Sequence, residues 1–171
     1  MVYLYHRVPN DMSGDILYPL NILKKKIPEV YSREIKKYFG REIVLKLKMP
    51  FLNCLWNDVL HFTPVDPHKI SKCLEEIGFE RKLSRGYKID SNLLEKEKAL
   101  IYLYRGKFFD RKDFIPYSQN KLKFLNQVTP LAKKYYLESF KEGKKILLFH
   151  KIPHVLYKGS LNVKGIEFIK A

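Results

Sequence analysis

The stretch between Pro50 and Pro67 concentrates side chains that can do chemistry. It holds the only tryptophan of the chain, Trp56, together with His61 and two asparagines, and it has no Lys or Arg although the formal net charge is +15. Buried amide, carboxyl and imidazole groups are unfavourable unless each finds a hydrogen-bond partner. The stretch is therefore either a core segment whose polar groups are satisfied locally, or a pocket wall where polar groups and a ring meet a small molecule.

Other residues could supply acid–base chemistry without a metal. A metal-independent ribonuclease needs His, Lys, Arg and Tyr to transfer protons and to stabilise charge on phosphate. The candidates are His6, Arg7, His61 and His150. A structural histidine that is satisfied within the fold is the alternative for each of them.

Metal chemistry is not expected. His150 and His154 have the spacing that pairs two ligands on a helix, but Pro153 disfavours a helix there, and no Cys or acid stands nearby to complete a zinc site. Only Asp58 and Asp66 lie near the tryptophan, and Asp66 is expected to cap a helix, which leaves too few carboxylates for magnesium. The phosphate-binding glycine loops and the nucleophile elbow of serine hydrolases are absent from the sequence.

Size and composition predict one domain over residues 1–171. Apolar residues make up 46% of the chain and aromatic residues 14%, enough for a hydrophobic core. Two cysteines cannot build a disulfide framework, and Cys54 is expected to be an inert core thiol. No apolar run approaches a signal peptide or the ~18 residues of a membrane span, so we expect a soluble, cytoplasmic protein with no membrane partner.

The positive charge is unevenly spread. Residues 24–48 carry nine Lys or Arg against three acids, and residues 101–171 carry fifteen against five. Basic flanks around a less basic middle predict a nucleotide or nucleic-acid partner, although the excess of Lys over Arg weakens any case for base-specific readout. An alternative is an interaction protein whose exposed aromatics, Tyr117, Phe108 and Phe109, dock on an acidic partner.

The elements that must position these residues alternate between strand and helix patterns. Strands are predicted at 2–8, 42–49, 59–62, 86–89, 99–104, 145–150, 155–157, 161–163 and 166–169. Helices are predicted at 20–26, 28–39, 67–77 and 130–142, and residues 105–128 have the least regular pattern. The sum is an α+β domain with a mainly antiparallel sheet flanked by helices.

Two segments resemble the ADP-ribosyltransferase-like fold of DNA-targeting ADP-ribosyltransferase toxins and RNA 2'-phosphotransferases. Leu4-Tyr-His-Arg-Val-Pro9 is similar to the opening strand of that family, in which a His follows an aromatic or apolar residue. Lys145-Ile-Leu-Leu-Phe-His-Lys-Ile-Pro-His-Val-Leu-Tyr-Lys-Gly159, with the strands after it, resembles the closing strand, proline turn and short strand.

The resemblance implies that NAD binds between two halves of a split sheet and that its glycosidic bond is cleaved through an oxocarbenium-like state. It implies that His6 positions the cofactor, that Tyr102 or Tyr104 stacks on nicotinamide and that Arg7 meets the pyrophosphate. The stretch from Trp56 to His61 has no firm counterpart in the family, and the pocket-wall interpretation adds its residues. The expected catalytic residues are then His6, Arg7 and His61, and the expected cofactor-binding residues are His6, Trp56, Asn57, Tyr102 and Tyr104. The resemblance thus implies a transferase that acts on nucleic acid or a nucleotide, as a toxin or a defence factor would.

The chain departs from this family at the late catalytic acid. These transferases place a Glu at the start of the closing strands, where this chain has Lys144 and Lys145. The RNA 2'-phosphotransferases work with His and Arg and need no such Glu, so its absence favours phosphate chemistry or a degenerate site. The alternative function is a small basic metal-independent ribonuclease or a non-catalytic nucleic-acid-binding protein.

Overall fold

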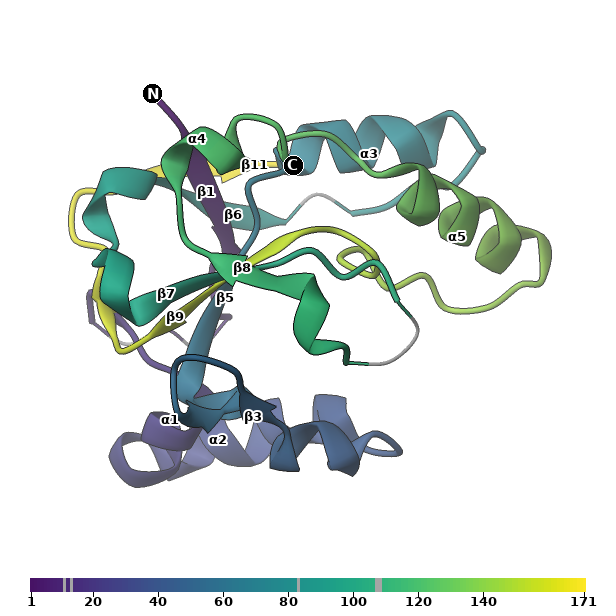
Figure 1. Ribbon diagram of the computed structural model, residues 1–171. Coiled ribbons are helices and arrows are strands. Elements are labelled where there is room, and N and C mark those ends of the chain that lie inside the picture. The colour runs from purple at the N-terminus through teal and green to yellow at the C-terminus, as the bar shows by residue number, and fades with distance from the viewer. Residues whose placement is uncertain (11, 13, 83, 107–108) are drawn as a thin grey trace.

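The computed structural model describes residues 1–10, 12, 14–82, 84–106 and 109–171, and Figure 1 shows their arrangement. The fold is α+β, and every strand pairing in this part of the chain is antiparallel, as the sequence predicts. Among the same residues, no helix combines the length and the apolar character needed to cross a membrane.

Two larger sheets form the centre of the fold. One has three strands in the order β1-β6-β11, and the other has four in the order β5-β9-β7-β8. Their bounds are β1 Tyr3–Arg7, β6 Arg85–Asp90, β11 Glu167–Lys170, β5 Val59–Phe62, β9 His154–Lys158, β7 Ala99–Tyr102 and β8 Phe114–Pro116. Tyr5 and Thr63 join the sheets, because each backbone N–H donates to the carbonyl of the other at 2.8 and 3.0 Å.

Two short two-stranded sheets and the helices complete the fold in the described residues. One sheet pairs β2 (Ile16–Leu17) with the distant β10 (Leu161–Asn162), and the other pairs β3 (Lys48–Met49) with β4 (Cys54–Leu55). The α-helices are α1 Leu20–Lys26, α2 Pro28–Glu34, α3 Pro67–Glu75, α4 Gln119–Leu122 and α5 Pro130–Lys141. The 3₁₀ turns are η1 Ile35–Tyr38, η2 Glu42–Lys46, η3 Trp56–Asp58, η4 Ser91–Leu93, η5 Lys96–Lys98 and η6 Arg111–Asp113.

Three apolar cores hold these layers together. One face of the four-stranded sheet packs with the three-stranded sheet around Leu4, Phe62 and Ile101. Its other face packs on residues between η2 and η3, around Met49 and Leu156. The third core lies between α3 and α5, which run side by side in Figure 1, while α1 and α2 form a separate layer below β5.

The helix signals in the sequence are largely confirmed. Helix α1 has the predicted bounds, and α3 begins as expected, with the Asp66 carboxylate accepting from the backbone N–H of His68 at 2.9 Å. Helix α5 begins after Thr129, whose hydroxyl oxygen accepts from the N–H of Ala132. Local capping groups in the sequence set these starts, so the sequence alone was enough to place them.

Two predicted strands are wrong. Most of 42–49 is the 3₁₀ turn η2, in which the Glu42 side chain accepts from the N–H of Gly40, and only β3 remains as strand. Residues 145–150 contain no strand, because hydroxyls of helix α5 take up their backbone groups: Tyr136 donates to the carbonyl of Leu148, and Tyr135 accepts from the N–H of Leu147. The two tyrosine hydroxyls therefore satisfy backbone groups that would otherwise pair with a neighbouring strand.

Two of the three aromatics named in the interaction hypothesis, Tyr117 and Phe109, pack inside the fold in the part of the chain that the structure describes. Tyr117 is buried and donates its O–H to the carbonyl of Ser91 at 2.6 Å. Phe109 packs against Trp56 and Phe114, and Phe108 lies outside the described residues. The irregular stretch 105–128 also contains β8, which its pattern did not reveal.

Candidate functional site

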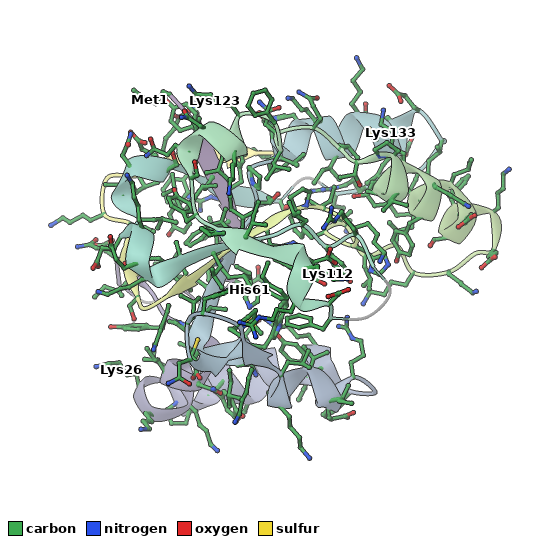
Figure 2. The ribbon with its side chains drawn as sticks, in the orientation of Figure 1. Met1, Lys26, His61, Lys112, Lys123 and Lys133 are labelled. Atoms are coloured by element: carbon green, nitrogen blue, oxygen red, sulfur yellow. The ribbon has the colours of Figure 1, made fainter. Side chains whose placement is uncertain are left out.

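A cluster of seven rings covers one end of the four-stranded sheet, on the face turned toward α1 and α2. We call it the ring cluster, and its members are Trp56, His61, Tyr102, Tyr104, Phe109, His150 and His154. Six of them are only partly buried and Tyr102 is buried, and in Figure 2 His61 lies between the sheet and the α1–α2 layer. The members come from four stretches of the chain, 56–61, 102–104, 109 and 150–154, so the fold and not the local sequence assembles them.

Strand alternation explains which side chains meet. His61 of β5 lies across from Leu156 of β9, and Tyr102 of β7 lies across from His154, so all four point to the same face. The His61 ring is 4.3 Å from Trp56 and 6.4 Å from His154 between centroids. Strand register, together with the alternation along each strand, therefore brings Tyr102, His61 and His154 to one face.

Tyr104 joins the second half of the cluster. Its ring stacks on Tyr102 at 5.0 Å, and its hydroxyl lies 2.8 Å from Nδ1 of His150. The ammonium of Lys151 sits 4.9 Å from the Tyr104 ring centroid and donates to the carbonyl of Gly106. A cation thus stands at the edge of the cluster.

The backbone is strained at this point. Tyr104 and Lys151 have φ values of 54° and 61°, a left-handed conformation that side chains other than glycine rarely adopt. Such residues cost about 1–3 kcal/mol each and persist only where their surroundings hold them. Here the buried Asp113 carboxylate accepts from Arg105 Nε and from the N–H of Gly106, and Thr129 donates to the Lys151 carbonyl at 2.7 Å.

Burial keeps the histidines neutral. Desolvation lowers the pKa of His61 to about 3 and the pKa of His154 to about 4, and the charge of His154 lowers the pKa of His61 further. A carbonyl oxygen only accepts, so His61 donates from Nε2 to Trp56 at 3.1 Å and His154 donates from Nδ1 to Ile152 at 2.7 Å. At neutral pH each ring therefore keeps one unprotonated nitrogen that can accept a hydrogen bond from a ligand.

Two cations of the helical layer act on the cluster. Desolvation lowers the pKa of His61 and of His150, and the charges of Lys37 and Arg41 add to these two shifts respectively. Desolvation raises the pKa of Tyr104, and the charge of Arg41 opposes that rise. Burial raises the pKa of Tyr38, which lies between Lys37 and Arg41 in the sequence, and the Trp56 side chain opposes that rise. The α2–η2 segment thus places positive charge beside a group of neutral rings.

His6 and Arg7 lie next to the cluster but outside it. Antiparallel pairing at Tyr5 and Thr63 puts His6 across from Phe62, so alternation turns His6 and His61 to opposite faces, and the His6 ring packs on Phe62 at 5.4 Å. Desolvation lowers the pKa of His6 to about 4, and its Nδ1 donates to the carbonyl of Arg7. Arg7 itself is exposed and donates to Asn10 at 3.3 Å.

The cavity beside His6 is small. It has a volume of about 50 Å³ and apolar walls from Leu17, Leu23, Ile27 and neighbouring residues. That space holds water but not a nicotinamide ring. Asn57, the remaining cofactor candidate, is buried in η3, and its Oδ1 has no hydrogen-bond partner within the described part of the chain.

Metal-ligand and thiol chemistry receive little support from this geometry. Within the described residues, no group of three or more His, Cys, Asp or Glu could hold a metal ion. Burial raises the pKa of the Cys54 thiol, as the sequence-based expectation of an inert cysteine requires.

Four of the seven predicted site residues belong to the ring cluster: Trp56, His61, Tyr102 and Tyr104. Sequence reasoning named His150 only as a general acid–base candidate and His154 only as part of an unlikely zinc pair, because it assumed that i,i+4 spacing matters on helices alone. The proline turn instead folds both histidines onto Tyr104, at ring distances of 5.2 and 5.9 Å. The period-two alignment of His154 with Tyr102 needed a strand register that no sequence pattern supplies.

Comparisons with protein-family models, with curated proteins and with solved structures found no match. The site therefore has to be interpreted from its own chemistry.

Proposed function

We propose that the protein binds NAD or a related nucleotide at the ring cluster and acts as an ADP-ribosyltransferase-like enzyme on nucleic acid or a nucleotide. The observation that carries the proposal is the meeting of His61, His154 and Tyr104 with Trp56, beside Lys37 and Arg41. Flat rings can stack on a base or a nicotinamide ring, and the neighbouring cations can bind the phosphates of the same nucleotide.

The protonation states refine this proposal. Neutral imidazoles offer acceptors to the amide of nicotinamide, to an exocyclic amine or to ribose hydroxyls, whereas phosphate oxygens are acceptors and need the lysine and arginine. A nucleotide presents both kinds of group at once. When bound, NAD would supply the glycosidic bond to be cleaved, and the chain would orient it through rings on one side and cations on the other.

The chain differs from the ADP-ribosyltransferase-like family at the position of the catalytic Glu. Lys144 and Lys145 are exposed where a catalytic Glu would stand. Glu34 of α2 is near enough for its charge to raise the pKa of His6, and it pairs with Lys37 at 3.3 Å. Glu34 is thus the carboxylate we would test first for a role in glycosidic cleavage.

The second candidate function is a metal-independent ribonuclease. It is favoured by the same two acceptor nitrogens and by the Tyr104–His150 pair, which could pass a proton between ring and hydroxyl. Here the cluster would take a ribose 2'-hydroxyl and a phosphate, with no need for NAD.

One assay separates the two functions. Purified protein is incubated with single-stranded RNA or DNA, with and without NAD, in the presence of EDTA. Release of nicotinamide that needs both the protein and His61, with no strand scission, supports the transferase. Cleavage of RNA without NAD supports the ribonuclease. If neither occurs and NAD gives no binding heat, the proposed function is wrong.

A further inference from the structure

The turn that joins η1 to η2 exposes two large apolar side chains among cations. We call residues 36–46 the basic tip. The Phe39 and Ile43 side chains are 73% and 74% exposed, which is high for any apolar residue in a folded chain. Lys36, Arg41 and Lys46 are exposed around them, and the only acid of the tip is Glu42.

The basic tip is ordered by its own hydrogen bonds. Gly40 has a φ of 75°, which lets the chain reverse, and its N–H donates to the Glu42 carboxylate at 2.9 Å. The Arg41 guanidinium donates to the carbonyl of Lys37 at 2.7 Å. Glu42 is therefore engaged with the turn itself, and the outward charge of the tip is positive.

The inner side of the tip is anchored to the ring cluster. Tyr38 is half-buried, with the Trp56 side chain among the groups that act on the pKa of its hydroxyl, and Leu47 packs on the core beneath the four-stranded sheet. Phe39, next in sequence, is directed to solvent. Arg41 also acts electrostatically on Tyr104 and His150, so the positive charge of the tip reaches the ring cluster.

We propose that the basic tip binds single-stranded nucleic acid, with a base stacked on Phe39, apolar contact to Ile43, and phosphates on Lys36, Arg41 and Lys46. Stacking on an exposed ring beside cations is how sequence-tolerant single-strand binders work, and each stacked base is worth about 1–3 kcal/mol. The inference deepens the proposed function, because it names the polymeric substrate and where that substrate docks; its test needs no nucleotide.

The charge and the exposed side chains of the basic tip favour single-stranded nucleic acid over a duplex or a membrane surface. A duplex keeps its bases stacked inside, so it can meet the cations but offers no free base to Phe39. An interfacial membrane helix carries a long apolar face, whereas the tip offers two apolar side chains on a 3₁₀ turn. A positive surface with one free ring and a short apolar neighbour fits an unpaired strand.

The test is fluorescence anisotropy with labelled single-stranded RNA, single-stranded DNA and a duplex of the same sequence, without NAD. Phe39→Ala is compared with Phe124→Ala, a matched control. Phe124 is 85% exposed and follows Lys123, which lies far from Lys26 of α1 in Figure 2. We expect Phe39→Ala to weaken single-strand binding about tenfold, a loss within the stacking range, and Phe124→Ala to change it less than twofold. Lys36→Gln should reduce the salt slope of log K by about 0.7.

Four results would overturn the proposal: no binding of any strand at low salt, equal losses in Phe39→Ala and Phe124→Ala, duplex affinity equal to single-strand affinity, or Phe39-dependent binding to anionic lipid vesicles instead. The RNA and DNA arms show which strand is preferred. Both phenylalanines are exposed, so an unchanged melting temperature in each variant certifies that the fold is intact. Tip binding, together with no nicotinamide release, no RNA cleavage and no binding heat for NAD in the assay of the proposed function, would leave this inference standing while removing that function.

Discussion

The hydroxyl of Tyr104 lies 2.8 Å from Nδ1 of His150, and this contact ties the chain after β7 to the turn before β9. The two residues are 46 positions apart, and each sits beside a backbone held in an uncommon conformation, at Tyr104 itself and at Lys151. Strain of this kind gathers where a fold holds side chains in a set arrangement for binding or chemistry.

Tyr104→Phe should remove this contact and little else. The free energy of unfolding should fall by about 0.5–1.5 kcal/mol, the usual net worth of one hydrogen bond, and the ¹⁵N chemical shift of His150 Nδ1 should move. Tyr135→Phe is the comparison, because the Tyr135 ring is 4.2 Å from the His150 ring but its hydroxyl contacts Leu147. A shift of Nδ1 in both variants, or in neither, would contradict the assigned pairing.

Asp113→Asn should loosen the segment that carries Tyr104. The buried Asp113 carboxylate accepts from Arg105 at 3.0 Å with one oxygen and from the N–H of Gly106 at 3.3 Å with the other. The asparagine side chain has a single oxygen, so it cannot keep both bonds. We expect a loss of about 1–3 kcal/mol in the free energy of unfolding, measured by urea denaturation. Asp110→Asn, an exposed carboxylate in the same loop, should lose less than about 1 kcal/mol. Similar losses in the two variants would remove the special role given to Asp113.

The buried histidines predict a stability that falls with acid. His6, His61 and His154 have folded pKa values of about 4, 3 and 4, below the ordinary 6.5, so the unfolded chain binds more protons between these values. Stability is thus fully present above pH 6.5 and is lost as the pH falls toward 4, by up to about 1.4 kcal/mol per pH unit for each histidine.

Urea denaturation between pH 7 and pH 5 measures that slope. His154→Gln should flatten the slope by about one histidine's share, whatever it does to stability at pH 7. His68→Gln is the control, because His68 is exposed and pairs with Asp66. A wild-type stability that does not change over this range would refute the neutral, buried state of the three rings.

Sequence reasoning was most successful where the signal is local. Helix starts at Asp66 and Thr129 depend on a capping side chain within three residues, and β1 and β5 depend on period-two patterns. It was wrong at 42–49, where the apolar alternation belongs to a 3₁₀ turn that leaves Ile43 exposed. Alternation alone cannot say whether a partner strand is present.

The site was harder to predict, because it depends on register between distant strands. The pairing of Tyr102 with His154 places their rings on one face, and nothing within either segment encodes that pairing. His6 shows the reverse case. The bridge between Tyr5 and Thr63 brings β1 beside the end of β5, yet alternation turns His6 away from the face that carries His61. One residue of register decides whether two histidines meet.

The central claim, that the ring cluster binds a nucleotide, is tested most directly by calorimetric titration of NAD into the wild-type chain, His61→Gln and Phe124→Ala. We expect one site in the wild type and in Phe124→Ala, and an affinity at least tenfold lower in His61→Gln, because this variant loses the imidazole ring that packs on Trp56 together with its unprotonated acceptor nitrogen, Nδ1. No binding heat in the wild type at any attainable NAD concentration, or equal affinity in all three proteins, would contradict the account.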